Sequence, residues 1–239
     1  MIYPAIASFF ENGVSGTISF TPSMIHGSVT VIMDINGLSP HQTYGIHIFE
    51  YGNFFRPGDH LNPDRKTHGS ILWTPERHVG DLQNNATTDA FGRIRWTFSD
   101  SQISLDTNKP ERCIIGRLVG ISSFPDDMGL CGLLDPTTHK FRSYESMSHQ
   151  ELNRLAVERG CRYREGLISW SSLIRHFIQG SSLHGNGGSL YSRAIIGIAG
   201  PPSISSSQET FFPDRIPTTN GFDPGYHTDN DLMPSMVFP

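Results

Sequence analysis

Three histidines and one aspartate gather in one stretch of the chain, HLNPDRKTHGSILWTPERHVGD. They are His60, His68, His78 and Asp81. Neutral imidazole nitrogens and a carboxylate oxygen are ligands that a tetrahedral Zn²⁺ accepts. The stretch therefore predicts a zinc site. The alternative is a polar surface loop that is His-rich because the chain holds 11 His.

The residues from 60 to 81 show no helical or alternating apolar period, which predicts a long loop with little core of its own. A loop of this length inside a compact domain needs something to order it. Closure by a metal ion would do so.

Short strands must carry this loop. β-branched and aromatic runs separated by Gly, Pro and Asn predict strands at 4–10, 13–22, 27–37 and 43–49. The run around 29–35 alternates cleanly, and Glu11-Asn12-Gly13 is a turn signal between the first two strands. Further strands are predicted within 87–100, 111–121 and 192–200. This pattern favours an all-β antiparallel sandwich or barrel.

Helices are predicted only between the last two of these strands, in the region 122–190. Ser148 to Glu151 form a capping box ahead of apolar residues at helical spacing. A second helix is predicted from Leu167 to Gln179, ending at Gly180. His176 lies beside its apolar stripe and is expected to be a partly buried or surface residue rather than a ligand.

Composition excludes several functions. The net charge of −5, a pI near 6.1 and the lack of any Lys/Arg run argue against nucleic-acid binding. No apolar run reaches the roughly 18 residues of a membrane span, and the start MIYPAIASFFENG does not resemble a signal peptide. Cys113, Cys131 and Cys161 are too few for a disulfide framework, which predicts free thiols and an intracellular or cytoplasmic compartment.

The C-terminal stretch 201–239 has seven Pro in 39 residues and scattered apolar side chains. This composition predicts an extended arm without a core of its own. The expected organisation is one β-barrel domain over 1–200, with a helical insertion at about 137–184, followed by the Pro-rich arm over 201–239.

Several short motifs occur together in one order: GVSGTISF, YGIHIFEYGN, HLNP, HVGDL, CIIGRLVG, DDMG, GNGGS and IIGIAG. In combination they resemble the copper/zinc superoxide dismutase family, over roughly residues 4–136 and 185–200. The resemblance implies an eight-stranded Greek-key barrel with two long loops, one of which binds zinc and one of which steers the anionic substrate.

The resemblance implies a matching residue in this chain for each zinc ligand of that family. His60 matches the imidazole that bridges copper and zinc, while His68, His78 and Asp81 match the other zinc ligands. Asp126, in PDDMG, matches the aspartate that holds a zinc-ligand imidazole from outside the coordination shell. The resemblance thus implies Zn²⁺ as the cofactor.

The copper site of the family is not matched, because other residues stand at several of its positions. His47 remains as one ligand, but Phe49 and Ser122 stand at two of the other positions, and Leu190 replaces the arginine that binds superoxide. A phenyl ring cannot coordinate, and a hydroxyl is a poor copper ligand. Zinc has no redox chemistry with which to replace copper. Copper is therefore expected to be absent.

The family disulfide is also missing, because Phe54 and Arg193 occupy its two positions. Another histidine could in principle restore copper binding. The candidates are His41, His139, His149, His176 and His184.

Two hypotheses follow. The first is a non-catalytic family member with a structural zinc, acting as a binding or assembly component, with partners at the insertion and the arm. In its losses the chain resembles copper-less relatives encoded by some large DNA viruses, which implies a virion-associated role. The second is an active superoxide dismutase with rearranged copper ligands; a weaker third is a copper-delivery or decoy partner of true dismutase subunits. The resemblance also implies a homodimer through Tyr51, Gly52, Ile115, Gly116 and Ile198.

Overall fold

Alternating apolar and polar residues form the strands of two facing sheets. The computed structural model describes residues 2–23, 27–71, 76–134, 140–159 and 169–200. The strand β3 (Val29–Asn36) buries every second residue, as its alternation predicts, and exposes Ile32 on the opposite face. Asn12 and Gly13 adopt positive φ angles of 54° and 78°, which confirms the turn predicted between the first two strands.

Five strands form the first sheet, in the order β11-β1-β2-β3-β6, and all its pairings are antiparallel. Besides β3, they are β1 (Ala5–Phe9), β2 (Ser15–Pro22), β6 (Ile94–Asp100) and β11 (Gly197–Ile198). The second sheet has the order β10-β7-β4-β5. It contains β4 (Thr43–Ile48), β5 (Asp81–Thr87), β7 (Leu118–Ser122) and β10 (Leu190–Ile195).

The strands β10 and β11 are separated by Ile196 alone, so one stretch of chain passes from the second sheet to the first. Counted as one strand, they complete the predicted set of eight. The all-β barrel or sandwich with a helical insertion is confirmed.

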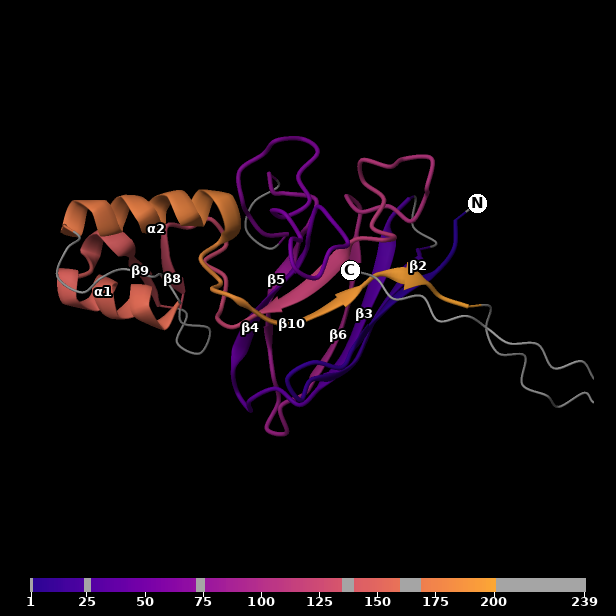
Figure 1. Ribbon diagram of the computed structural model, residues 1–239, viewed down its shortest axis with the longest axis horizontal. Helices are drawn as coiled ribbons and strands as arrows, with labels where there is room; N and C mark the ends of the chain where they lie inside the picture. The colour runs from indigo at the N-terminus through magenta and orange to yellow at the C-terminus, as the bar shows by residue number, and fades with distance from the viewer. Residues whose placement is uncertain (1, 24–26, 72–75, 135–139, 160–168, 201–239) are drawn as a thin grey trace, which may run out of the picture. The chain divides into compact units, whose positions relative to one another are not determined.

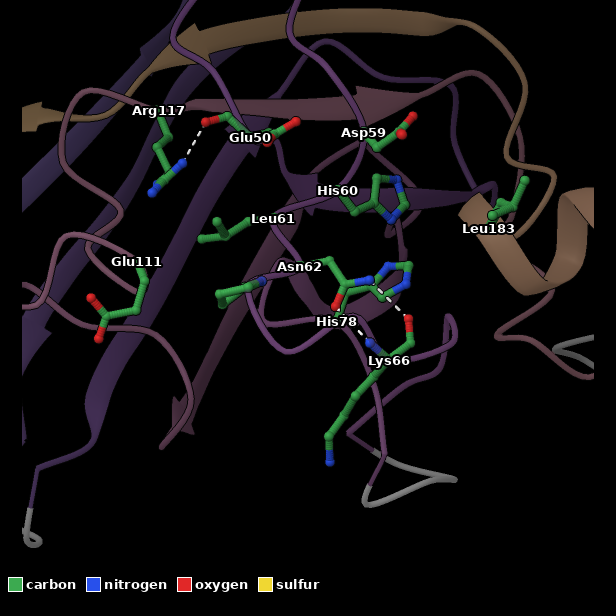
Figure 2. Close-up of a pocket in the computed structure, with 11 residues that line it drawn as sticks. Glu50, Asp59, His60, Leu61, Asn62, Lys66, His78, Glu111, Arg117 and Leu183 are labelled. Atoms are coloured by element: carbon green, nitrogen blue, oxygen red, sulfur yellow. Dashed lines mark hydrogen bonds between the residues drawn. The ribbon is translucent and has the colours of Figure 1, made fainter.

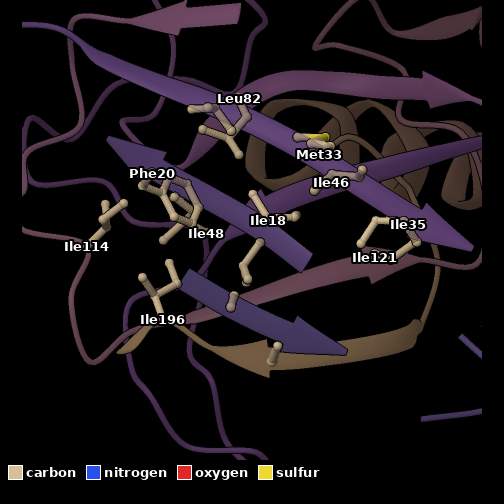
Figure 3. Close-up of a cluster of buried hydrophobic side chains, with 14 of the residues drawn as sticks. Ile18, Phe20, Met33, Ile35, Ile46, Ile48, Leu82, Ile114, Ile121 and Ile196 are labelled. Atoms are coloured by element: carbon tan, nitrogen blue, oxygen red, sulfur yellow. The ribbon is translucent and has the colours of Figure 1, made fainter. Parts of the chain in front are cut away.

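The main core lies between the two sheets (Figure 3). One sheet contributes Ile18, Phe20, Met33 and Ile35, and the other contributes Ile46, Ile48, Leu82 and Ile121. All are nearly inaccessible to water. Burying an aliphatic side chain of this size stabilises a fold by roughly 1.5–3 kcal/mol, so this core holds the barrel that carries the His-rich loop.

Two strands of the barrel differ from the sequence prediction. The strand β5, sequence DLQNNAT, was not predicted, because its polar residues lack the alternation that marks a half-buried strand. The strand predicted over 111–121 is reduced to β7, because the chain turns through 111–117 before pairing begins. All five residues of β7 are buried, so both faces of this strand are covered.

The insertion has a core of its own. It begins with a hairpin of β8 (Gly132–Leu134) and β9 (Phe141–Ser143), which was not predicted, followed by the 3-10 turn η1 (Tyr144–Ser146). Helices α1 (His149–Glu158) and α2 (Trp170–His184) follow, and Figure 1 shows them packed with the hairpin beside the barrel. Their buried residues form a second hydrophobic cluster: Tyr144, Met147, Leu152, Ala156, Leu173, Ile174 and Phe177.

The predicted capping box of α1 is confirmed, because Ser148 and Glu151 each satisfy the other's backbone N–H. The predicted end of α2 is wrong. The helix continues through Gly180 to His184 and ends at Gly185, whose φ of 67° is the left-handed value typical of a C-terminal cap. The first residues of the predicted helix, 167 and 168, lie outside the described residues.

Cys113 and Cys131 are free thiols. Cys161 and the predicted arm over 201–239 lie outside the described residues. None of the helices in the described part of the chain is both long and apolar enough to span a membrane.

Candidate metal centre

The strands β4 and β5 place two residues of the centre side by side. A register shift between Ile46 and His47 brings His47 opposite Asp81, the first residue of β5. An isolated bridge pairs His60 with Phe49, directly after β4. The predicted loop between His60 and Asp81 is confirmed over its described residues, 60–71 and 76–80, and it is anchored by Leu61 and Val79, which lie in the main core.

All four predicted zinc ligands meet in one buried cluster. One donor atom from each of His60, His68, His78 and Asp81 lies within 4.8 Å of every other. The histidines are at most 5% exposed and Asp81 is inaccessible. The cluster therefore presents three imidazoles and a carboxylate to one enclosed point, which is the ligand set of a tetrahedral zinc site.

Asp81 is the centre of this group. Its Oδ1 lies 2.8 Å from Nδ1 of His60, and its Oδ2 lies 3.0 Å and 3.3 Å from Nδ1 of His68 and His78. Backbone N–H groups of Gly69 and His78 donate to the same Oδ2 at 3.1 Å and 2.9 Å. The carboxylate therefore fixes the loop around itself and turns each Nδ1 inward.

Asp126 orients two histidines from behind. Its Oδ1 lies 2.9 Å from Nε2 of His68, as predicted, and its Oδ2 lies 2.5 Å from Nε2 of His47. The contact with His47 links the predicted zinc residues to the remaining copper-type histidine. With both Nε2 atoms engaged, each Nδ1 is left available as a ligand.

Charge and burial set the protonation states of the cluster. Burial, followed by the neighbouring His47, lowers the pKa of His60 to about 3, which keeps this imidazole neutral. Burial alone would raise the pKa of Asp81, but contacts with the three histidines outweigh it and hold the carboxylate ionised. For His68, burial opposes protonation, but the charge and hydrogen bond of Asp126 and the close carboxylate of Asp81 outweigh it and raise its pKa.

Two buried nitrogen atoms without partners also indicate that these residues fit a metal ion. Nδ1 of His68 and Nδ1 of His78 are buried and make no hydrogen bond, although both lie close to Asp81. Buried nitrogens without a partner are costly. A cation coordinated by these atoms would satisfy both of them at once.

The end of α2 covers the centre. The backbone N–H of His68 donates to the carbonyl of Ser182 at 2.9 Å. A Cβ atom on Gly185 would lie 2.2 Å from Oδ1 of Asp126 and 2.5 Å from Nε2 of His68, so only glycine fits this position. The insertion is thus joined to the backbone of the metal loop.

The side of His60 that faces β4 has a different character. The Phe49 ring stands edge-on to His60, with ring centroids 5.3 Å apart at 89°, and His47 stacks on His60 at 4.0 Å. A Cβ atom built on Gly120 would lie 2.6 Å from the Leu190 side chain and 3.0 Å from that of Phe49. Two apolar side chains therefore meet over Gly120, beside His60.

Among the described residues, only one other group of three or more metal-capable side chains occurs, formed by His47, His68 and Asp126. None of the described histidines proposed as replacement copper ligands belongs to either group, namely His41, His149, His176 and His184. His139 lies outside the described residues. As expected, His176 is partly buried.

Several supporting residues were not predicted. The buried Arg77 donates twice to Asp100 on β6, at 2.8 Å each, and also donates to the carbonyl of Asp81 at 2.6 Å. Asn84 and Asn85 on β5 reach the carbonyls of Gly69 and Asp126. The available signals were an Arg directly before His78 and an Asn pair three residues after Asp81.

Asp127 is a further residue without a predicted role. Its carboxylate accepts hydrogen bonds from Tyr144 at 2.7 Å, Ser181 at 2.8 Å and Asn186 at 2.9 Å. Its backbone N–H donates to the carbonyl of Gly185 at 2.8 Å. The residue next to Asp126 therefore fastens the insertion to the barrel.

A pocket of about 410 Å³ reaches the centre from the outside (Figure 2). His60 and His78 form part of its wall, together with three carboxylates and two cations: Glu50, Asp59, Glu111, Lys66 and Arg117. The fold and this site define a class: an antiparallel β-barrel with a buried cluster of metal-capable side chains between a long loop and a strand edge.

Comparison with known proteins specifies the class. A family model described as copper/zinc superoxide dismutase matches residues 14–142. The chain is 37% identical over 129 residues to the Cu-Zn superoxide dismutase of Yarrowia lipolytica, across 52% of this chain and 80% of that protein. It is 34% identical over 129 residues to the Cu-Zn superoxide dismutase of Paramecium bursaria Chlorella virus 1, across 51% of this chain and 64% of that protein.

Among solved structures, the crystal structure of the clock protein EA4 matches with a TM-score of 0.57 and 28% identity. The match covers 83% of this chain and 96% of that one. The chain belongs to the copper/zinc superoxide dismutase family.

Proposed function

We propose that this protein is a non-catalytic member of its family that holds a structural Zn²⁺ at His60, His68, His78 and Asp81. Zinc accepts three nitrogens and one oxygen in a closed tetrahedral shell, and such shells stabilise folds rather than catalyse reactions. The ion would hold the loop against the barrel.

One observation carries the non-catalytic part of the proposal. Phe49 and Leu190 meet over Gly120, where the family places a copper ligand and the arginine that binds superoxide. Neither side chain can coordinate a metal or attract an anion. His47 and His60 would be the only family copper ligands left, and two imidazoles are too few to define a copper site.

Ser122, at the position of the remaining copper ligand, is buried and pairs with Leu190 across the sheet. Dismutation requires a metal that cycles between two oxidation states, which zinc does not. Without catalysis, the proposed role is binding or assembly, through protein partners that contact the insertion and the arm over 201–239.

A virion-associated form of this role is part of the proposal, and the relative from a chlorella virus supports it. Mass spectrometry of purified particles from the source of the chain would test it. Absence of the chain from the particles would remove this part of the proposal and leave the zinc assignment standing.

The decisive experiment combines elemental analysis of the purified protein with a superoxide-consumption assay. We expect about one zinc per chain and no copper. Superoxide consumption should not exceed that of a solution that contains zinc but no protein. Stoichiometric copper with activity would instead establish the alternative, an active dismutase with rearranged ligands.

The ligand assignment is tested separately with His78→Ala. This variant should release zinc and make the 60–81 loop sensitive to protease, because a buried ligand is lost. His41→Ala, which removes a histidine outside both clusters, is the matched control. Unchanged zinc content in His78→Ala would overturn the assignment.

We also propose a homodimer through the predicted surface. Tyr51 and Ile198 are 54% and 53% exposed, and a pocket of about 370 Å³ includes Tyr51, Gly52, Ile115 and Gly116 in its wall. Sedimentation should give a dimer that Ile198→Asp dissociates, since a charge would replace an apolar contact. Phe91→Asp, at an exposed phenylalanine elsewhere, should leave the dimer intact.

A further inference from the structure

The buried metal cluster borders a pocket on one side. His68 and Asp81 are turned inward, with side chains that are inaccessible to water. His60 and His78, in contrast, form part of the wall of the 410 Å³ pocket, and Figure 2 shows their rings close together there. Nδ1 of His78 is buried and without a hydrogen bond, and it belongs to a side chain of this wall.

The opposite approach is obstructed. The Phe49 edge and the stacked His47 ring cover His60 on that side, and Leu190 packs with Phe49 over Gly120. On the side covered by the end of α2, the backbone of Gly185 lies against Asp126 and His68 with no room for a Cβ atom. An ion on these paths would have to displace packed side chains or backbone.

The pocket wall carries charge that suits a cation. Asp59 directly precedes His60, and Glu111 lies across the pocket (Figure 2). Within the described part of the chain, neither carboxylate forms an ion pair. The two cations of the wall do not outweigh its three carboxylates, Glu50, Asp59 and Glu111. Lys66 pairs with Glu76 at 3.4 Å, and Arg117 donates to the carbonyls of Glu50, Cys113 and Pro110.

We infer that this pocket is the route by which the metal ion enters and leaves the cluster, with Asp59 and Glu111 attracting the cation. The inference rests on the proposed zinc site. Carboxylates beside a narrow approach raise the local concentration of a cation and hence its association rate, and salt screens the effect. Leu183, exposed at the end of α2, forms part of the pocket wall and limits the width of the route.

The test measures Zn²⁺ uptake by the metal-free protein (residues 1–239) in stopped flow, and Zn²⁺ release into excess chelator. The double variant Asp59→Asn/Glu111→Gln should slow uptake by about three- to tenfold at low salt, and the difference should shrink in 0.5 M NaCl. Asp34→Asn, which neutralises an exposed acid paired with Arg95 on the first sheet, should not change the rate.

A steric variant tests the same route without changing charge. Leu183→Trp should slow uptake and release by similar factors and leave the zinc affinity unchanged, because it narrows the passage but not the site. Val157→Trp, at an equally exposed position on α1, is the matched control. Leu190→Ala thins the obstruction on the opposite side and should not accelerate uptake.

Two results would overturn the inference. One is uptake by both pocket variants at the rates of their controls, and the other is faster uptake by Leu190→Ala. Zinc that binds with unaffected rates refutes only the route. A wild-type protein that takes up no zinc refutes the proposed function itself.

Discussion

At the scale of single residues, two carboxylates determine how the histidines are arranged. Asp81 contacts the inward Nδ1 atoms of three imidazoles, and Asp126 holds the Nε2 atoms of His68 and His47. His68 lies between both carboxylates, so its ring has one possible orientation. The site is organised by its acidic residues before any metal is considered.

Asp126→Asn should weaken zinc binding by roughly 10–100-fold, the usual cost of losing a partner that orients a ligand. The two histidines contact different oxygens of Asp126, and an asparagine has an oxygen at only one of these two positions and an NH₂ group at the other. Competition with a chromophoric chelator would measure the change. Asp34→Asn is the control, and equal affinities in the two variants would show that Asp126 has no orienting role.

The missing copper ligands can be restored at two positions. Phe49→His/Ser122→His should give a protein that binds Cu²⁺ beside zinc, because His47 and His60 already lie there with stacked rings. Electron paramagnetic resonance and metal content would detect the ion. Each single change should hold copper weakly, and tight copper binding by the unmodified protein would contradict this account.

At the scale of elements, Arg193 on β10 holds the loop that follows β4. Its Nη1 donates to the carbonyl of Phe54 at 2.6 Å, and its backbone N–H donates to Glu11 at 3.1 Å. The guanidinium also lies 3.3 Å from the carboxylate of Glu11. One side chain thus connects three segments at the two positions where the family has its disulfide.

Arg193→Ala should lower the free energy of unfolding by about 1 kcal/mol, the range of a partly exposed charged hydrogen bond. It should also increase proteolysis near Phe54. Urea denaturation would measure the first effect and limited digestion the second. Arg95→Ala removes a more exposed ion pair on the first sheet, and an equal loss there would argue against a specific clamp.

The elements that sequence analysis predicted correctly are those with a local signal. Alternation in β3 and the capping box of α1 are determined by neighbours a few residues away. β5 was missed because Asn84 and Asn85 serve contacts with Gly69 and Asp126 that are distant in sequence. The end of α2 was placed at Gly180, although that glycine admits the Asn186 side chain and does not terminate the helix.

At the scale of the whole molecule, the metal cluster lies where the barrel meets the insertion. Each part has a hydrophobic core of its own. The backbone of His68 joins the metal loop to the end of α2. The ligand types could be predicted from spacing and resemblance, but the coverage of the site by α2 could not, because it depends on tertiary contacts.

Removal of the metal should therefore affect both parts unequally. In excess chelator, hydrogen–deuterium exchange should increase first in the 60–81 loop and the last turn of α2, while β1–β3 stay protected by their core. Added zinc should raise the melting temperature with concentration, as for any ligand of the folded state. Equal exchange with and without zinc would contradict a structural role.

The carboxylate of Asp127 has a consequence for how such a chain can be altered. It accepts from Tyr144 inside the insertion and from Asn186 directly after α2, and its backbone N–H donates to Gly185, so the chain leaves and re-enters the barrel beside one residue. At this point the barrel therefore requires only that the two ends of the inserted segment lie close together. A different folded module with equally close termini could be grafted there, which makes the site a natural place to exchange one recognition unit for another.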